Sequence, residues 1–284
     1  MNGQVKKLGI VAGGGQLPLK LAEVCKETGR PYSVCALSGW ADEVIEEHPH
    51  RWFSIGELSA LTKYFTNEGV DEIVFAGNVQ RPDFKTLKID WAGAKLLPRA
   101  LLAARKGDEA LLRMLVEIFE DAGFTVVGAH EVLSALLIEE GPLGSIIVDE
   151  DAAIDIAKAR EVVEALGSLD VGQGAVVANG LVLAVEAAEG TDAMLDRVAN
   201  LREEIRGTEE ERAGVLLKFP KPMQERRIDL PTIGQKTLRG VARAGLKGVA
   251  VAAGGALVID RDAVARLADE LGVFVVGIAE GERE

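Results

Sequence analysis

The sequence predicts an α/β protein of two domains, with a parallel sheet in the first half and a distinct mixed α/β domain in the second. Three observations support this. The chain has 284 residues, which is longer than a common single domain. Its first half alternates apolar runs with helical patterns, the rhythm of a parallel sheet covered by helices. Its second half contains a hairpin signal followed by shorter apolar runs.

Elements of the first half follow from short apolar runs, which predict strands, and from apolar residues at helical spacing. The expected strands are "LGIVAG" (8–13), "YSVCAL" (32–37), "EIVFAG" (72–77) and "FTVVGAHEV" (124–132). The expected helices cover about 17–27, 58–66 and much of 96–123. The phrase "EEGPLGS" (139–145) breaks the pattern and predicts a loop.

In the second half, the apolar spacing over 151–166 predicts an amphipathic helix that links the domains. "GAVVANGLVLAVEA" (174–187) predicts a hairpin turning at Asn179 and Gly180, a dipeptide favoured where both turn residues need positive φ. Further strands are expected in "AGVLLKF", "GVAVAAGGALVI" and "FVVGIAE", with helices near 192–206, 234–245 and 261–271. We therefore expect domains at 1–149 and 169–284, joined by a linker helix at 150–168.

The composition excludes several classes of protein. Thirty-two basic against forty-five acidic residues give a net charge of −13, which argues against a general nucleic-acid binder. The longest uncharged run near the C-terminus, 248–259, is far shorter than the roughly 20 residues that span a bilayer. No secretory signal precedes the first strand, so we expect a cytoplasmic protein. Two cysteines and three histidines form no disulfide framework or zinc pattern.

The glycine loop "VAGGGQLP" lies between the first strand and a helix, where backbone N–H groups and the positive helix end can receive an anion. Gly13 and Gly15 match only the first two glycines of the dinucleotide fingerprint, because Pro18 takes the third place and no acid ends the next strand. Three interpretations remain open. The loop is a tight structural turn, or Gly13, Gly14 and Gln16 contact some other nucleotide or a phosphate group, or the loop binds a nicotinamide dinucleotide despite its incomplete fingerprint.

"FAGNVQRPDF" places Asn78 and Arg81 beyond the end of an apolar strand, where open α/β sheets gather ligands. The forked N–H groups of the Arg81 guanidinium could donate hydrogen bonds to a phosphate or a uracil carbonyl. A loop arginine paired with Asp83 is the simpler alternative.

The segment 81–106 holds seven basic residues and two acids in an otherwise acidic chain. Basic amphipathic stretches can lie on anionic membrane surfaces. The alternative is the solvated face of a helix that packs on the core.

"VEAAEGTDAMLDR" gathers Glu186, Glu189 and Asp192 around a glycine where a helix starts. A helix cap at Thr191 or Asp192 explains one acid but not three. Carboxylates brought together repel unless a cation joins them, and Mg²⁺ takes a few carboxylates together with waters and substrate phosphates. The stretch therefore suggests a magnesium site, with simple solvent exposure as the alternative, above all for Glu189.

A second polar cluster lies in "KFPKPMQERRIDLPTIG", a loop fixed by three prolines and a glycine. Its cations surround two acids, and the charged residues are Lys218, Lys221, Arg226, Arg227, Glu225 and Asp229. Cations that hold phosphate oxygens beside a carboxylate that binds an ion or takes a proton from water suit diphosphate chemistry. "ARKGDEALLR" adds Lys106 and Asp108 in the first half.

Six motifs together resemble those of the LpxI-type UDP-2,3-diacylglucosamine pyrophosphatases, in order over about 8–280. They are "AGGGQLP", "AGNVQRPDF", "ARKGDEALLR", "GAHEV", "GQGAVVANGLVLAVEAAEGTDAMLDR" and "KPMQERRIDLPTIG". The resemblance implies a Rossmann-like N-terminal domain, a linker helix and a distinct C-terminal domain. It also implies a Gram-negative enzyme of lipid A synthesis that hydrolyses UDP-2,3-diacylglucosamine to UMP and 2,3-diacylglucosamine 1-phosphate (lipid X), with Mg²⁺ as cofactor.

The resemblance identifies Asp229 with the family's catalytic aspartate. Our hypothesis is that Asp229 and Asp192, with Glu186, place Mg²⁺ on the diphosphate while water attacks the lipid-side phosphorus. Lys221 and Arg197 would offset the charge that develops. The expected substrate-binding residues are Gly13, Gly14, Gln16, Asn78, Arg81, Lys106, Asp108, Gln173, Thr191, Arg197, Gln224 and Thr232. Glu225, where some members of the family have Asp, receives no role.

A substrate with two acyl chains implies an apolar groove in the C-terminal domain and peripheral contact with the cytoplasmic face of the inner membrane, which segment 81–106 would approach. A homodimer is compatible with the sequence, although no repeat or coiled-coil seam argues for it. Two alternatives stay open. The glycine loop would suit a nicotinamide- or flavin-dependent oxidoreductase, and the acids and arginines would also suit a non-catalytic nucleotide-sugar or lipid carrier.

Overall fold

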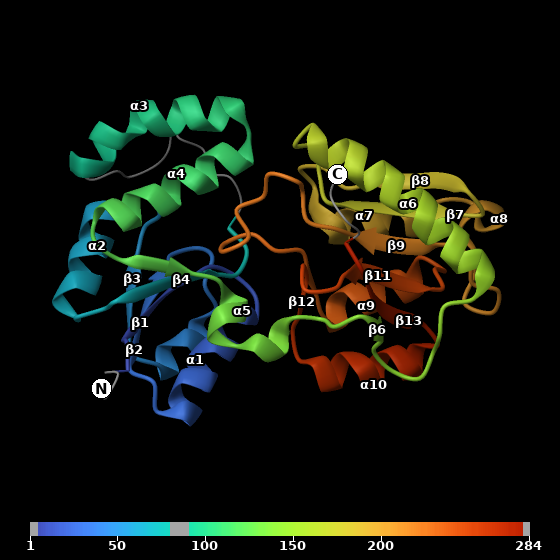
Figure 1. Cartoon of the computed structure of the whole chain (residues 1–284), viewed down its shortest axis with the longest axis horizontal. Coiled ribbons are helices and arrows are strands. Elements are labelled where there is room, and N and C mark those ends of the chain that lie inside the picture. The colour runs from blue at the N-terminus through green and yellow to red at the C-terminus, as the bar shows by residue number, and fades with distance from the viewer. Residues whose placement is uncertain (1–4, 80–90, 281–284) are drawn as a thin grey trace. The chain divides into compact units, whose positions relative to one another are not determined.

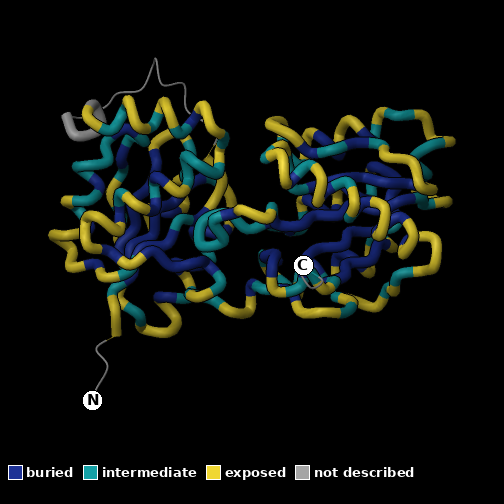
Figure 2. Tube along the Cα trace, turned by 45° about the horizontal axis from the view of Figure 1, so that its top comes forward, coloured by how far each residue is buried: buried dark blue, intermediate teal, exposed yellow. Residues whose placement is uncertain are grey.

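The computed structural model describes residues 5–79 and 91–280, the side chains of 91–94 excepted. It divides into two compact units, Met1–Ser134 and Ala135–Glu284 (Figure 1). In each unit the strands are mostly buried, and exposed residues gather on helices and loops (Figure 2). None of the helices in the described ranges has the length and apolar character needed to cross a bilayer.

The first unit is built on a five-stranded parallel sheet with the order β3-β2-β1-β4-β5. Its strands are β1 (Leu8–Ala12), β2 (Tyr32–Leu37), β3 (His50–Phe53), β4 (Glu72–Ala76) and β5 (Thr125–Val127). This is the strand order of a Rossmann fold, in which the order reverses between β1 and β4. The loops that follow these two strands therefore meet at the edge where such sheets bind ligands.

Helices cover this sheet because parallel strands are joined by crossover connections. They are α1 (Leu17–Thr28), α2 (Leu58–Asn67), α3 (Trp91–Lys106), α4 (Asp108–Asp121) and α5 (Ala129–Val132), with a short 3₁₀ turn at η1 (Glu43–Glu47). A second 3₁₀ turn, η2 (Ser134–Leu136), lies across the boundary between the two units. Helix α4 packs against β5, and α3 packs on α2 and α4 at the outside of the unit (Figure 1).

The second unit has a six-stranded mixed sheet with the order β6-β13-β11-β9-β7-β8. Its strands are β6 (Gly141–Pro142), β7 (Gly174–Ala178), β8 (Leu181–Val185), β9 (Val215–Lys218), β11 (Gly248–Ala252) and β13 (Phe274–Ile278). Strands β9, β11 and β13 are parallel, whereas β6, β7 and β8 pair antiparallel with their neighbours. A parallel pair, β10 (Thr232–Ile233) and β12 (Leu257–Val258), stands apart from this sheet.

Helices cover both faces of the mixed sheet because alternate strand residues point to opposite sides. Val176 and Leu216 lie in one core with the helices α7 (Gly190–Ala199), α9 (Gln235–Arg243) and α10 (Arg261–Leu271). Val177 and Leu217, their neighbours in sequence, lie in a second core with α6 (Glu150–Ser168). The unit is therefore a three-layer α/β/α arrangement. The remaining helix is α8 (Glu203–Arg206).

These observations confirm the predicted fold class. The hairpin prediction is also confirmed, because β7 and β8 turn at Asn179 and Gly180 with φ of 52° and 74°. The turn is bonded to α6, since Asp155 accepts the N–H groups of Asn179 and Gly180 at 2.9 and 2.7 Å while its own side chain is buried.

Several predicted elements differ from the structure. The loop expected over 139–145 contains the short strand β6, and the helix expected near 192–206 is split into α7 and α8. The strand expected over 124–132 ends at Val127, because Gly128 begins α5 with its N–H bonded to the Glu131 carboxylate. Strand β3 carries the sequence "HRWF" and has no apolar run that would have revealed it.

The helix expected as a linker is α6, and in the structure it packs against β7 and β9 of the second unit. Its apolar side chains, among them Ile156 and Val163, belong to the second core of that unit. The two units divide between Ser134 and Ala135, ahead of the expected boundary at 149. The sequence spacing reveals an amphipathic helix but not the surface that the helix covers.

Candidate active site

The second unit contains a polar cluster where β9 ends and the loop to β10 begins. We call it the Asp229 cluster, and its members are Gln173, Glu186, Thr191, Lys218, Gln224 and Asp229. Lys218 is the last residue of β9, and the N–H of the next residue, Phe219, donates to the Gln173 carbonyl at 2.9 Å. The strand end and the loop are thereby tied together.

Gln224 organises the loop that carries Asp229. Its Oε1 accepts the Lys221 N–H at 2.7 Å, which closes a tight turn. Its Nε2 donates to Asp229 Oδ2 at 2.6 Å and to Gln173 Oε1 at 2.9 Å. Because the Gln224 side chain is buried, these bonds fix the direction of the Asp229 carboxylate.

The pKa of the Asp229 carboxyl group is raised above the ordinary aspartate value. Burial raises its pKa, and the charge of Glu186 acts in the same direction. The hydrogen bond from Gln224 and the charges of Lys221 and Lys218 oppose this rise without cancelling it. Asp229 is thus a carboxylate held beside two cations in a site where its ionised form is costly, as is common at functional sites.

Lys218 and Glu186 are connected through one hydroxyl group. Lys218 Nζ donates to Thr191 Oγ1 at 2.7 Å, and Thr191 donates to Glu186 Oε1 at 2.7 Å. The other acceptor of Lys218 is the Thr232 carbonyl at 3.4 Å. Lys218 is 4% exposed and Glu186 7% exposed, so both charges lie inside the protein. Since both acceptors of Lys218 are uncharged, its positive charge remains available to an anion.

Glu186 has a second carboxylate oxygen, Oε2, that is buried without a hydrogen-bond partner in the described residues. Two glycines make room for this side chain and its backbone. A Cβ on Gly174 would lie 2.5 Å from Oε2, and one on Gly172 would lie 1.9 Å from the Glu186 carbonyl oxygen. The "GQG" motif therefore serves the close approach of Glu186, and an unsatisfied buried oxygen calls for a ligand or proton.

Lys221, the second cation near Asp229, forms an ion pair with Asp170 at 2.6 Å, in which the two side chains are 13% and 29% exposed. This pair limits the positions that the Lys221 ammonium can take. The Asp170 carboxylate also neutralises much of the Lys221 charge, whereas the acceptors of Lys218 in the described residues carry no charge.

The three acids expected to hold a metal ion are not gathered in one place. Glu186 and Asp229 belong to the cluster, whereas Asp192 is 49% exposed and forms an ion pair with Lys236 at 2.6 Å. Across the described residues no group of three or more His, Cys, Asp or Glu side chains is arranged to hold a metal ion. Glu186 and Asp229 remain as two carboxylates, one with an unpartnered oxygen, which fits Mg²⁺ because it needs few protein ligands when substrate phosphates and waters complete its shell.

Other charged residues of the two motifs pair with one another. Arg197 donates to Glu189 at 2.7 Å and to the Val185 carbonyl at 3.1 Å, and its side chain is mostly exposed. The Arg227 guanidinium donates to both carboxylate oxygens of Glu225, each at 2.8 Å. These contacts hold the loop and the start of α7 in shape, and they lie outside the Asp229 cluster as defined above.

In the first unit, the predicted residues after β1 and β4 do lie side by side. Gly14 and Asn78 form a backbone bridge, with N–H to carbonyl distances of 2.9 and 2.8 Å. The Gly13 N–H donates to the Ala76 carbonyl at 2.8 Å. The amides of Gly13 and Gly14 are therefore used within the fold and are not free to bind a dinucleotide pyrophosphate. Gln16 is exposed directly before α1.

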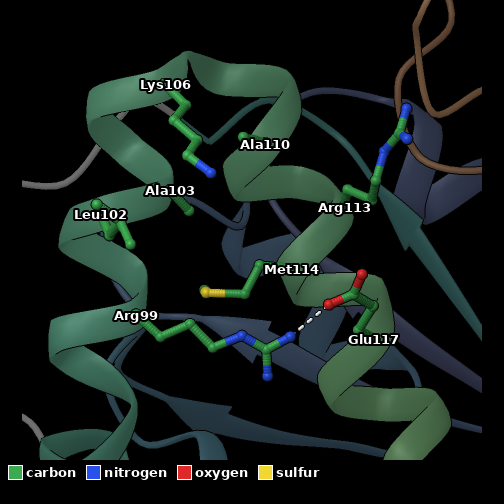
Figure 3. A pocket seen from close by; sticks show the side chains of 8 residues that line it. All are labelled: Arg99, Leu102, Ala103, Lys106, Ala110, Arg113, Met114 and Glu117. Carbon is green, nitrogen blue, oxygen red and sulfur yellow. Dashed lines mark hydrogen bonds and ion pairs between the residues drawn. The ribbon is translucent and has the colours of Figure 1, made fainter.

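The remaining predicted residues of the first unit lie near the junction of α3 and α4. Lys106 is the last residue of α3 and Asp108 the first of α4. Lys106 lines a groove between these helices (Figure 3). Arg81 lies outside the described residues.

Sequence reasoning named Lys218 only among the cations of its loop and did not name Asp170. The position of Lys218 directly after the apolar run "VLL" could have identified it, because a charge buried at the end of a strand is costly unless it binds a partner or ligand. Asp170 carries no such signal, since it is one of many acids between a helix and a strand.

The fold and the cluster define a two-domain α/β protein whose second unit holds buried acids and cations suited to an anionic substrate. Residues 7–136 match the LpxI N-terminal domain and residues 139–276 match the LpxI C-terminal domain. Over 279 residues the chain is 51% identical to a protein of Caulobacter vibrioides named UDP-2,3-diacylglucosamine pyrophosphatase LpxI, with 98% of this chain and 100% of that relative covered. The chain belongs to the LpxI family, as the sequence motifs predicted.

Proposed function

We propose that this protein hydrolyses the diphosphate bond of UDP-2,3-diacylglucosamine to UMP and 2,3-diacylglucosamine 1-phosphate. Its relative over the whole length carries this activity in its name. The observation that supports it within the chain is the Asp229 cluster, in which a carboxylate with a raised pKa lies beside Lys218 and Lys221.

Binding of the diphosphate is assigned to the two lysines. Lys218 offers a buried charge whose acceptors in the described part of the chain, the Thr191 hydroxyl and the Thr232 carbonyl, are uncharged. A charge inside a protein acts more strongly on an anion than the same charge in water. As negative charge grows on the phosphate oxygens in the transition state, Lys218 and Lys221 would offset it. Gln173 and Thr232 help to hold this arrangement, through bonds to Gln224 and Lys218 respectively.

Asp229 is assigned the central role because Gln224 fixes its direction. Its carboxylate must be ionised to hold a cation or to orient the attacking water. Glu186 and Asp229 are the residues that would hold Mg²⁺. When bound, the ion supplies a positive charge that polarises the diphosphate and makes water more acidic.

The bond that breaks is assigned to the lipid side. Water adds to the phosphorus next to the sugar, the bond from that phosphorus to the bridging oxygen breaks, and UMP leaves with that oxygen. The proton released by water passes to the solvent or to a carboxylate of the cluster.

Phosphorus NMR tests the proposal. The protein is incubated with UDP-2,3-diacylglucosamine in water enriched in heavy oxygen, with and without Mg²⁺. We expect UMP and the sugar phosphate to form only with Mg²⁺, with the label on the sugar phosphate. Label on UMP would contradict the side of attack, turnover in a chelator would contradict the metal, and survival of the diphosphate in every condition would favour a carrier.

A further inference from the structure

The outer face of α3 carries a set of exposed cations and leucines. From residue 95 to 106 the helix has four basic residues and no acid, in a chain with a net charge of −13. Leu101 and Leu102 are 42% and 58% exposed, which is unusual for adjacent leucines on a helix that packs against others. Such a combination of exposed apolar and basic residues marks an interaction surface.

The spacing on this face is regular. Arg105 lies four residues after Leu101, and Lys106 lies four residues after Leu102. Residues four apart are neighbours on a helix surface, so each leucine has a cation one turn away. Ala104 is buried on the other side of the helix, which keeps the leucine and cation face outward.

Two of the cations on this face have no partner among the residues that the structure describes. Arg99 forms an ion pair with Glu117 of α4, and Arg113 forms one with Glu109 at 3.0 Å. Arg105 and Lys106, in contrast, have no ion-pair or hydrogen-bond partner within 5–79 and 95–280. The α4 acids Glu117 and Glu109 therefore neutralise Arg99 and Arg113. The positive charges at the C-terminal end of α3 stay exposed.

A groove between α3 and α4 continues this surface. It has a volume of about 310 Å³ and is lined by Arg99, Leu102, Ala103, Lys106, Ala110, Arg113, Met114 and Glu117. Figure 3 shows Lys106 and Met114 directed toward the space between the helices, and Leu102 lines the groove from α3. The groove therefore combines an apolar floor with a cationic edge, which suits a phosphate group attached to a hydrocarbon chain.

We propose that the outer face of α3, with this groove, is a docking surface for an anionic phospholipid bilayer. Leu101 and Leu102 enter the boundary between headgroups and acyl chains, while Arg105 and Lys106 contact lipid phosphates. A nucleic acid would use the cations but has no need of the leucines, and it would be repelled by the acidic remainder of the chain. The proposal concerns the first unit and does not depend on the proposed hydrolysis.

Vesicle sedimentation of the whole chain without substrate tests the proposal. The wild type should sediment with vesicles of mixed phosphatidylglycerol and phosphatidylcholine, and not with phosphatidylcholine alone. Arg105→Glu with Lys106→Glu should weaken binding by at least about 30-fold, because each lost cation near an anionic surface costs about fivefold. Leu101→Gln with Leu102→Gln should weaken binding without changing its salt dependence.

The matched control is Lys26→Glu with Arg266→Glu, which reverses one lysine and one arginine that are exposed and form no hydrogen bond or ion pair in the described residues. It should bind vesicles as the wild type does. Equal loss in the control would show a bulk charge effect and overturn the proposal. So would unchanged binding of the α3 variant, or displacement of wild type from vesicles by duplex RNA with the same dependence on Arg105 and Lys106.

A labelling experiment keeps the test independent of how the charge variants fold. Leu102→Cys, modified with a polarity-sensitive fluorophore, should show a blue-shifted emission on anionic vesicles. Lys26→Cys, modified in the same way, should not. Absence of a shift at position 102 would overturn the proposed surface.

Discussion

Two members of the Asp229 cluster, Glu186 and Thr191, come from the same stretch of sequence as the exposed ion pairs at the start of α7 but lie in a different environment. Thr191 bonds into the cluster, whereas the next residue, Asp192, pairs with Lys236 near solvent. A charge inside a protein is weakly screened and costly, while an exposed pair is screened by water and salt. Neighbouring residues of one motif therefore differ in function because the fold gives them different surroundings.

The largest effect is expected at Asp229. Asp229→Asn keeps the shape and the bond to Gln224 but removes the charge, and kcat should fall by about 10²–10⁴-fold. Product formation with saturating substrate and Mg²⁺ measures this. Activity close to that of the wild type would place the chemistry elsewhere in the protein.

Lys218→Met should have the next largest effect, with kcat/KM lowered by about 10²–10³-fold, because one preorganised charge on the phosphates is lost. The variant should fold, since methionine fills a similar volume and removes a buried charge. Lys236→Met, at an exposed position, is its control. Equal losses in the two variants would contradict the special role of the cluster.

Thr191→Val should lower kcat by about 10- to 100-fold. The hydroxyl that bridges Lys218 and Glu186 is lost, so both charged groups can shift by about an ångström. Thr191→Ser restores the hydroxyl and should recover most of the activity. If serine fails to rescue the activity, the methyl group rather than the hydroxyl is what matters.

The raised pKa of Asp229 predicts two effects of pH. Activity should fall on acidification at a pH above the ordinary aspartate value of 3.8, because the ionised form is required. Stability behaves in the opposite way. Between the ordinary and the raised pKa the folded state binds more protons than the unfolded chain, so the contribution of this group falls as pH rises through that window.

Thermal melting across pH measures the second effect. Asp229→Asn should gain stability relative to the wild type as pH rises through the window, and the difference should stay constant above it. A difference that does not vary with pH would mean that the carboxyl group titrates normally.

The smallest effect is expected at Asp192. Asp192→Asn breaks only the exposed pair with Lys236, and stability should change by less than about 1 kcal/mol. If Asp192 is nevertheless a metal ligand, as the sequence suggested, the concentration of Mg²⁺ needed for half-maximal activity will rise sharply. A magnesium titration of this variant therefore distinguishes an exposed ion pair of Asp192 from a role as a metal ligand.

Much of the fold could be predicted from the sequence because its signals are local. The apolar run of β1 and the Asn179–Gly180 turn are examples, since each depends on a few adjacent residues. Strand β3 was missed because its four residues, HRWF, begin with two polar residues and form no apolar run. The role of the glycine loop could not be settled either, because its amides bond to the chain after β4, a contact that depends on the strand order.

The candidate site was only partly predictable for the same reason. Asp229 and Gln224 lie in one motif, and the structure brings them together. Glu186 and Asp192 looked equivalent in sequence, yet only Glu186 lies inside, since it follows a strand and Asp192 faces outward from the start of a helix. The contact of Lys221 with Asp170 joins residues 51 apart in sequence, which no spacing rule could supply.

The bond between Asp155 and the hairpin tip has a consequence for anyone who engineers this protein. A two-residue turn between strands is ordinarily a first choice for inserting an epitope tag or for creating new chain ends. Here Asp155 is only 2% exposed, and its carboxylate accepts the N–H groups of both turn residues. Opening the turn would leave a buried charge without its donors, so fusions at this tip should be poorly expressed even though the tip itself faces the solvent.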